Sequence, residues 1–538
     1  MIIISNQVQP IFILPEGSSR SSGLGAQKAN IAAAKLVSDT IRTTLGPKGM
    51  DKMLVNSSGE VIITNDGATI VDEMNVEHPA AKMIVEVAKT QDTEVGDGTT
   101  TAVVIAGELL HASEALLDKN IHPTVISDGY KLAAQKAQEI LQKLGQKINI
   151  SDKVTLRNIA MTAMTGKNVE WAKQKLAEIA VSATLHIVEG NVVDLDNIKI
   201  EKKEGGGSSD TELVQGIILD KERVQNDMPK QVIDAKIALI DSAFEVKSTE
   251  IDAKIQITDP NQLQAFLDQE EKTLQDFVNA IKNAGANAIF CSKGIDDIAQ
   301  QFLSDAGIYA IRRVTESDIV KLSKATNAKI ISRIKDIKPT DLGFGTVEAR
   351  KLGDEDMTYV TKCKNPKAVT IVIRGGTEHV IDEVERAVKD ALGDLSAAIK
   401  LGFCVAGGGA TEIELSKQLR EYSGTLSGRE QLAVEAFADA LEMIPRTLAE
   451  NAGLDPIDML TALKAAHDSG SKWSGLNVFV GKTQDMWASG VIEPLKIKTQ
   501  AIQSAAEAAI LILRIDDIIS SGKPQSQMPP SGMPPMMQ

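Results

Sequence analysis

Residues 95–110 read VGDGTTTAVVIAGELL, where a glycine-rich loop runs directly into a long apolar helix. Glycine lets the backbone approach phosphate oxygens closely, and the helix start offers free N–H groups and a positive dipole end. The hydroxyls of Thr99, Thr100 and Thr101 add further donors. Asp97 would repel phosphate unless a divalent cation lies between them, so the stretch indicates a Mg²⁺-dependent phosphate site. The alternative is that Asp97 and Thr99 only cap the helix.

Three more glycine-rich turns precede helix starts, namely TLGPKG at 44–49, NDGAT at 65–69 and AGGGAT at 406–411. Together, the four turns can line one cleft. A purely structural explanation exists for the NDG turn, because this sequence is common in hairpin turns. The same holds for two other candidate residues, since Asp390 can be an exposed helix residue and Lys167 a solvated loop lysine. The sequence contains no Walker A, G-x-G-x-x-G or H-E-x-x-H pattern, so it lacks the common nucleotide and zinc signatures.

The composition restricts the partners and the compartment. The chain of 538 residues has 58 Lys and Arg against 73 Asp and Glu, a formal net charge of −15, which argues against nucleic acid as a partner. Its three cysteines form no C-x-x-C pair, so neither a disulfide framework nor a cysteine zinc site is expected. The N-terminal residues lack the basic segment of a signal peptide, and the apolar run Ala508–Leu513 is far short of the ~20 residues of a membrane span. We expect a soluble, cytoplasmic protein.

Hydrophobic periodicity divides the chain into helical ends and an α/β middle. Helices are predicted at Ala26–Leu45, Ala80–Thr93 and Thr99–Asp118, with a β-hairpin after the first, formed by the strand Val61–Thr64 and the turn Asn65–Gly67. Strands and amphipathic helices alternate from about residue 216 to 369, and long helices then return. This order predicts an α/β domain inserted into a helical one.

Two domain boundaries are expected between the helical and the α/β parts. The composition changes near residues 150–151, and the run EKKEGGGSSD at 201–210 is typical of an exposed connection. The last residues, rich in Pro, Gly and Met, cannot form a packed core, so we expect a disordered tail.

One segment of the α/β region, Ser248–Ala280, is unusual. Asp259 can cap a helix that begins at Pro260, and the apolar stripe of this helix includes Leu263, Phe266 and Leu267. Periodicity alone favours a helix that packs in the core of its domain. The functional alternative is a projecting helix that exposes its apolar tip to a partner.

The motifs occur together in an order that resembles the group II chaperonins, which include the archaeal thermosome subunits. The resemblance covers nearly the whole chain and is much more specific than any single loop. The blocks that carry it are TTLGPKGMDKML at 43–54, ITNDGATI at 63–70, VGDGTTTAVVIAGELL at 95–110, GGSSDTELVQGIILDKE at 206–222, IVIRGGTEHVIDEVERAVKDAL at 371–392, VAGGGATEIELS at 405–416, AGLDPIDML at 452–460 and GVIEPLKIKTQAI at 490–502.

The resemblance implies a multidomain α and α/β fold with discontinuous domains. It implies a mainly helical equatorial ATP-binding domain from residues 1–150 and 405–522, a small α/β intermediate domain from 151–216 and 370–404, an α/β apical substrate-binding domain from 217–369 with a helical lid protrusion at about 248–280, and a disordered tail at 523–538. The protrusion would carry the apolar lid residues Leu263, Phe266 and Leu267.

The resemblance also implies roles for individual residues. The ATP-binding residues would be Thr44, Leu45, Gly46, Pro47, Gly98, Thr99, Thr100, Thr101, Lys167, Gly408, Asn477 and Glu493. Asp97 would bind Mg²⁺, while Asp66 and Asp390 would flank the γ-phosphate, with Asp390 orienting or deprotonating the attacking water. Gly408 and Glu493 would contact the nucleoside. The identity of Gly408 is open, because three glycines are adjacent, and some family members have aspartate in place of Glu493.

The function implied is that of an ATP-driven folding chamber with the cofactors ATP and Mg²⁺. Its subunits would form two stacked rings of eight or nine, homomeric or mixed, enclose unfolded proteins and need no separate co-chaperonin lid. One alternative is a nucleotide-binding ring or filament scaffold with negligible turnover, against which the intact Asp66, Asp97 and Asp390 argue. The other is a small-molecule kinase, for which the middle of the chain shows no polar metabolite site.

Overall fold

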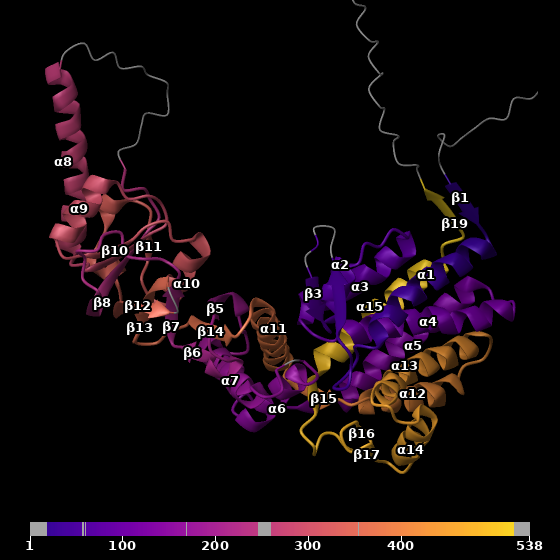
Figure 1. Cartoon of the computed structure of the whole chain (residues 1–538). Helices are drawn as coiled ribbons and strands as arrows, with labels where there is room; N and C mark the ends of the chain where they lie inside the picture. Colours follow the sequence, from indigo (N-terminus) through magenta and orange to yellow (C-terminus); the bar gives the residue numbers. More distant parts are fainter. Residues whose placement is uncertain are drawn as a thin grey trace, which may run out of the picture.

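The computed structural model describes residues 19–55, 59, 61–167, 169–245, 260–352 and 355–520. They form three bodies that follow one another along the molecule, which we call the helical, middle and outer bodies (Figure 1). The chain runs from the helical body through the middle body to the outer body and then returns. The antiparallel strands β1 (Ser19–Ser22) and β19 (Asp517–Ser520) pair, so the two ends of the described chain lie together. The mixture of helices and sheets agrees with the predicted class.

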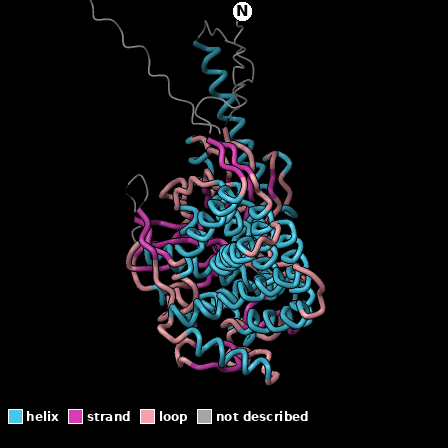
Figure 2. Tube along the Cα trace, turned by 90° about the vertical axis from the view of Figure 1, so that its right-hand side faces the viewer, coloured by secondary structure: helices cyan, strands magenta, loops and turns pink. Residues whose placement is uncertain are grey.

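The helical body is built around α4 (Thr99–Asp118). This helix packs against α1 (Leu24–Arg42), α3 (Pro79–Val95), α13 (Glu430–Asn451) and α15 (Leu495–Leu513). A helix that is apolar on nearly every side is stable only when it is surrounded, and Val104, Ile105 and Leu109 are all buried. Among the described residues, α4 alone is long and apolar enough to cross a membrane, but 72% of its most apolar window is buried in the molecule, as in a core helix. Figure 2 shows the helices of this body side by side.

The other elements of the helical body come from both ends of the chain. They are α1 (Leu24–Arg42), β2 (Lys52–Val55), β3 (Val61–Thr64), α2 (Gly67–Glu73), α3 (Pro79–Val95), α5 (Pro123–Leu144), β4 (Gln146–Lys147), β15 (Phe403–Ala406), α12 (Ala410–Ser423), α13 (Glu430–Asn451), α14 (Pro456–Asp468), β16 (Ser474–Asn477), β17 (Lys482–Asp485), β18 (Ile492–Pro494) and α15 (Leu495–Leu513).

The predicted hairpin forms, but its predicted turn is wrong. Strands β2 and β3 pair antiparallel, and the residues that connect them precede β3 rather than follow it. Asn65–Gly67 instead leads into α2, where Asp66 is the N-cap residue and accepts a hydrogen bond from the Thr69 backbone N–H. An N-cap and a hairpin turn use the same residue types, so the local sequence did not separate them.

The middle body is drawn from two distant segments. Its strands are β5 (Ile198–Glu204), β6 (Glu212–Val214) and β14 (Val369–Gly375), and its helices are α6 (Lys153–Met164), α7 (Lys173–Ile187) and α11 (Glu378–Leu401). Strand β14 lies between a parallel β5 and an antiparallel β6. The run at 201–210, predicted as an exposed connection, is one only in part. Residues 201–204 belong to β5, and the loop after them leads to β6 in the same sheet.

The outer body contains a mixed sheet with the order β10-β9-β8-β12-β13-β7, and β11 pairs with β8 at its side. Helices cover it, and its buried residues form clusters separate from the core of the helical body. The elements are β7 (Gly216–Leu219), β8 (Gln231–Ile240), α8 (Pro260–Ala284), β9 (Ala288–Cys291), α9 (Asp297–Asp305), β10 (Tyr309–Ile311), α10 (Glu316–Thr326), β11 (Ile330–Ile331), β12 (Gly343–Leu352) and β13 (Glu355–Thr361).

Helix α8 combines the two alternatives for the unusual segment. It begins at Pro260, as predicted, and stands out from the outer body at its N-terminal end (Figure 1). Its C-terminal half packs in the core through Leu274, Val278 and Ile281. The side chains of Leu263, Phe266 and Leu267 lie outside the described part, as do residues 248–259 and the predicted tail at 523–538.

Candidate functional site

Every residue predicted for nucleotide and metal binding lines one cleft at the junction of the helical and middle bodies. The cleft has two adjoining parts that share Leu45, Gly46, Thr101, Thr162, Thr165, Glu493 and Lys498. The polar part also contains Thr44, Asp66, Asp97, Gly98, Thr99, Thr100, Lys167 and Asp390. The second part contains Pro47, Gly408 and Asn477, together with apolar side chains such as Ile444, Leu448 and Met486.

The loop before α4 has a backbone that presents the helix start to the cleft. Gly96 and Gly98 have φ values of 86° and 78°, which L-residues with side chains rarely adopt. Gly98 is the N-cap residue, and no side chain caps the helix. The alternative that Asp97 and Thr99 only cap α4 is therefore wrong. The first-turn N–H groups of α4, which have no intrahelical acceptor, remain available to an anion.

Asp97 projects from the same loop. Its Oδ1 accepts a hydrogen bond of 2.6 Å from the Gly98 backbone N–H, and its carbonyl accepts one of 2.8 Å from Gln91 Nε2. Gln91, which is fully buried, thus fixes the loop from behind. Among the described residues, no three His, Cys, Asp or Glu side chains are arranged to hold a metal ion together. Mg²⁺ is often held by one or two carboxylates with phosphate oxygens and water, and Asp97 fits that use.

The start of α2 lies directly against the start of α4. A Cβ atom on Gly67 would come within 2.4 Å of Thr100 Oγ1 and 2.9 Å of Thr99 Oγ1, so only glycine permits this approach. Asp66 Oδ2 accepts hydrogen bonds from the backbone N–H and the hydroxyl of Thr69, at 2.9 and 2.7 Å. Asp66 therefore caps α2 and also lines the polar part of the cleft.

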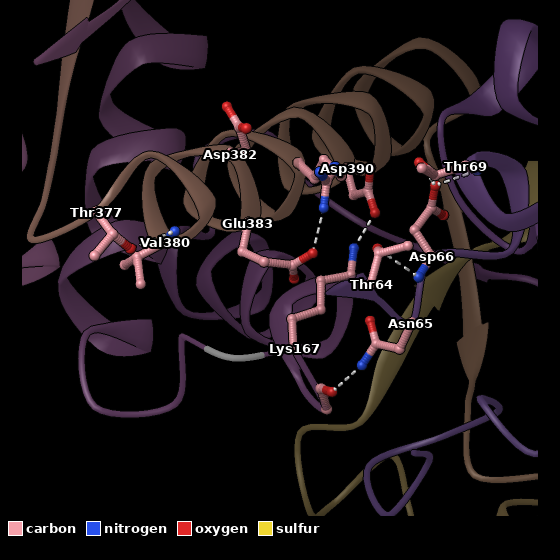
Figure 3. Close-up of polar contacts among 12 residues, drawn as sticks. Thr64, Asn65, Asp66, Thr69, Lys167, Thr377, Val380, Asp382, Glu383 and Asp390 are labelled. Atoms are coloured by element: carbon pink, nitrogen blue, oxygen red, sulfur yellow. Dashed lines mark hydrogen bonds and ion pairs between the residues drawn. The ribbon is translucent and has the colours of Figure 1, made fainter. Parts of the chain in front are cut away.

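Asp390 reaches the cleft from α11 and pairs with Lys167 of the loop between α6 and α7 (Figure 3). Burial, together with the carboxylates of Asp97 and Asp66, raises the pKa of Asp390, and the Lys167 ammonium offsets this only in part. Burial alone would lower the pKa of Lys167, but Asp390 and Asp97 outweigh it and raise the pKa. Asn65 Nδ2 donates a 2.6 Å hydrogen bond to the Gly166 carbonyl, which ties this loop to the turn before α2.

The turn 44–47 closes one side of the cleft. Gly46 has a φ of 82°, and a Cβ atom there would meet Leu448 Cδ2 at 2.2 Å. The Thr44 hydroxyl donates a 2.8 Å hydrogen bond to the Ile41 carbonyl at the end of α1, so it is not a free donor. Leu45 and Gly46 border both parts of the cleft, whereas Pro47 borders only the less polar part.

The Gly407–Gly409 turn and strand β16 form the less polar end. Gly409 is the N-cap of α12, with a φ of 79° and no side-chain cap, and the Ala410 backbone N–H donates a 3.2 Å hydrogen bond to the Gly407 carbonyl. The Gly408 carbonyl accepts a 2.9 Å hydrogen bond from the Leu476 backbone N–H. Asn477 Oδ1 accepts from the backbone N–H groups of Phe479 and Val480, so its side chain holds the turn that borders the cleft.

Two buried charged residues near the cleft were not predicted. Lys498, on the first turn of α15, lines both parts of the cleft. Asp394 lies one helical turn after Asp390, is fully buried, and neither of its carboxylate oxygens has a hydrogen-bond partner in the described structure. Its i, i+4 spacing from Asp390 was visible in the sequence, but its burial depends on how α11 packs.

The profile of the TCP-1/cpn60 chaperonin family matches residues 37–523 of the chain. The chain is 58% identical to thermosome subunit beta of Methanothermobacter thermautotrophicus over 98% of its length and 99% of that relative. It is 60% identical to thermosome subunit beta of Archaeoglobus fulgidus, covering 96% and 95% of the two chains, and 58% identical to a thermosome subunit of Pyrococcus horikoshii at the same coverage. Family match, identity and coverage agree, and the chain belongs to the TCP-1/cpn60 chaperonin family.

Proposed function

We propose that this protein is a subunit of an ATP-dependent chaperonin that encloses unfolded proteins and promotes their folding. The observation that carries the proposal is the convergence of the uncapped start of α4 and three aspartates in one cleft between two bodies. Free N–H groups bind phosphate, and carboxylates beside them serve metal binding and water activation. The family membership supports the same function and does not favour a scaffold without turnover.

We assign the three bodies to the domains of a chaperonin subunit. The helical body is the equatorial ATP-binding domain (1–150 and 405–522), the middle body is the intermediate domain (151–216 and 370–404), and the outer body is the apical domain (217–369). In this assignment, α11 connects the intermediate domain to the ATP site. It belongs to the middle body and supplies Asp390 to the cleft at the junction with the helical body.

In the proposed site, the phosphates of ATP lie in the polar part of the cleft, at the start of α4 and near Gly46 and Thr99–Thr101. Asp97 would hold Mg²⁺, and the chemistry that this ion would supply is neutralisation of charge on the phosphates. Asp390, with its raised pKa, accepts the proton of the attacking water. Asp66 flanks the same phosphate. The nucleoside lies at the less polar end, near Gly408, Asn477 and Glu493.

The ion pair between Lys167 and Asp390 suggests how nucleotide binding changes the subunit. A γ-phosphate placed between these residues attracts Lys167 and so competes with its ion pair to Asp390. Asp390 is then free to orient water, and the loop that carries Lys167 moves with the phosphate. Because both residues belong to the middle body, occupancy of the cleft is coupled to the position of that body and of the apical domain beyond it.

We further propose a cytoplasmic double ring of eight- or nine-membered rings, homomeric or mixed, that binds unfolded proteins and closes with its own lid. The N-terminal end of α8 stands away from the apical domain and suits such a lid (Figure 1). A separate co-chaperonin is then not needed.

Electron microscopy of the purified protein, with and without Mg·ATP, tests the proposal together with the rate of phosphate release. We expect double rings that hydrolyse ATP and close at the apical end in a transition-state mimic. Rings or filaments that bind ATP without releasing phosphate would favour the scaffold, and a monomer that phosphorylates a small molecule would favour the kinase.

A further inference from the structure

A second cavity, of about 340 Å³, adjoins the two aspartates that flank the proposed position of the γ-phosphate. We call it the rear cavity. Its walls come from α2, the end of α3 and α11, and the residues that line it include Asp66, Ala68, Asp72, Asp92, Lys389 and Asp390. Asp66 and Asp390, both labelled in Figure 3, also line the polar part of the cleft. These two carboxylates therefore form the wall between the cleft and the rear cavity.

The rear cavity and the two parts of the cleft follow one another in a line. The polar part shares Asp66 and Asp390 with the rear cavity, and it shares Glu493 and Lys498, among others, with the less polar part. The rear cavity and the less polar part have no described lining residue in common. A nucleotide whose nucleoside lies in the less polar part therefore fills one end of the line and leaves the rear cavity open at the other end.

The chemistry of hydrolysis sets the side from which water must approach. The water oxygen forms a bond to the γ-phosphorus while the bond from that phosphorus to the bridging oxygen breaks, and the electron pair of the broken bond leaves with ADP. The attacking and leaving oxygens lie roughly in line, so the water approaches from the side opposite to ADP. In the proposed orientation, that side faces Asp66, Asp390 and the rear cavity, and Asp390 takes the proton of the water.

The charges of the rear cavity restrict what can pass through it. Four aspartates line it, against two cations, Arg386 and Lys389. Both cations are already paired within α11, Arg386 with Glu383 and Lys389 with Glu385 at 2.8 Å. Burial, followed by the fields of the neighbouring aspartates, raises the pKa of Asp92, as expected where negative charge gathers. Such a cavity repels a phosphate ion, whereas water, which is neutral, can pass.

We propose that the rear cavity is the water inlet of the ATPase site: water reaches the γ-phosphate through it, between Asp66 and Asp390, while the nucleotide fills the other end of the line. This inference rests on the proposed function. A polar cavity of this volume has room for several water molecules, and its carboxylates accept hydrogen bonds from them. The product phosphate, which the acidic walls repel, leaves through the cleft.

The test fills the rear cavity from two different walls of the assembled protein, by Ala68→Phe on α2 and by Lys389→Trp on α11. Each variant should slow single-turnover hydrolysis of Mg·ATP by about 10-fold or more, because fewer molecules then hold a water in line with the phosphate. Phosphate release, followed with a fluorescent phosphate sensor, should slow in parallel. The calorimetric affinity for Mg·AMP-PNP should stay within about 3-fold of the parent, since neither residue lines the cleft.

Each blocking variant has a matched control that leaves the cavity open. Ala68→Ser changes the same position with little added volume. Lys389→Met removes the same charge and the same ion pair to Glu385 as Lys389→Trp, but it lacks the bulk of the indole ring. Both controls should hydrolyse ATP at the rate of the parent. If a blocking variant does not assemble, Ala68→Leu, which adds less volume than Ala68→Phe, takes its place and should slow hydrolysis in the same way.

The outcomes separate this inference from the proposed function. A parent protein that does not hydrolyse ATP contradicts the proposed function. An active parent whose assembled blocking variants hydrolyse ATP equally fast shows that water takes another route. Hydrolysis at the parent's rate followed by slow phosphate release would make the rear cavity a phosphate exit and overturn the inlet. Controls that are as slow as the blocking variants would show that the effect does not come from filling the cavity, and would overturn it as well.

Discussion

Asp390 and Lys167 are 223 positions apart in the chain and meet in the cleft through the packing of α11 against α6 and α7. In the proposed mechanism, Lys167 stays paired with Asp390, the proposed base, until the γ-phosphate of ATP competes for the lysine.

Asp390→Ala should slow ATP hydrolysis by about 10²-fold or more, because a general base contributes roughly 10²–10⁴-fold. Nucleotide should bind at least as tightly as in the parent, since the start of α4, Gly46 and Asp97 are intact and Lys167 has lost its ion pair to Asp390. Single-turnover hydrolysis and calorimetric binding of Mg·ATP measure the two effects separately. Asp390→Asn, which keeps the side-chain shape, should match the alanine variant in rate. Turnover equal to that of the parent in either variant would exclude Asp390 as the base.

Asp394→Asn should stabilise the nucleotide-free protein near neutral pH. Burial, followed by the fields of Asp97 and Asp390, raises the pKa of Asp394 well above its usual range. The folded state therefore holds this proton more tightly than the unfolded state, and stability falls as pH rises from the unfolded pKa near 3.9 to the raised folded pKa. The gain is the loss of this proton linkage, about 1.4 kcal/mol for each pH unit above the unfolded pKa until the folded pKa is reached.

Calorimetric unfolding midpoints of parent and variant, measured from about pH 4 to pH 8, check this prediction. The difference should be small at the acid end, where both states of the parent carry the proton, and grow toward neutral pH. Asp382→Asn, on the same helix but paired with Lys202 at 3.1 Å on the surface, is the control and should give no gain. A constant or reversed difference would show that Asp394 is paired in the folded protein.

At the element scale, α8 has an inner half that stabilises the outer body and an outer half that the proposed lid uses. Leu274, Val278 and Ile281 are buried, whereas residues 268–272 are exposed. The boundary at Leu274 defines where a deletion can stop, because removing each large buried side chain costs about 2–5 kcal/mol.

Deletion of residues 251–273 should therefore leave a protein that folds, forms rings and hydrolyses ATP, because all proposed phosphate contacts lie elsewhere. It should fail to enclose substrate. The measurement is protease protection of a trapped unfolded protein in the presence of ATP and a transition-state mimic. A longer deletion to residue 281 removes the buried side chains as well and should destabilise the outer body. Full protection by the shorter deletion would mean that this segment is not the lid.

At the scale of the whole molecule, the separate cores predict which parts fold alone. The outer body takes its buried residues from one continuous segment, 216–369, apart from a small cluster in which Ile218, Met357 and Tyr359 contact Val372 of the middle body. The middle body combines residues on both sides of that segment in one core.

A fragment of residues 216–369 should unfold in one cooperative thermal transition, at a midpoint somewhat below that of the outer body in the full chain, because the cluster with Val372 is exposed. The matched fragment 151–215 should show no such transition, since it lacks β14 and α11. Circular dichroism against temperature distinguishes them. A non-cooperative 216–369 fragment, or a cooperative 151–215 fragment, would contradict the division into cores.

The local elements and the chemistry of the loops could be predicted from the sequence alone. Helix α4 has the predicted bounds of Thr99–Asp118, because periodicity, glycines and flanking turns act within a few residues. The order of the motifs indicated the family, and the resemblance to that family predicted one nucleotide site. All residues predicted for this site line the observed cleft.

How these parts meet could not be predicted from the sequence and is seen in the folded structure. In the folded protein, Asn65–Gly67 leads into the capped start of α2 and does not form a hairpin turn, and α8 has a buried half and a projecting half. Lys167 pairs with Asp390, and Asp394 and Lys498 are buried. Each of these depends on contacts between residues far apart in the chain. Burial changes the charge balance and the hydrogen-bond partners of a side chain, and no local pattern contains that information.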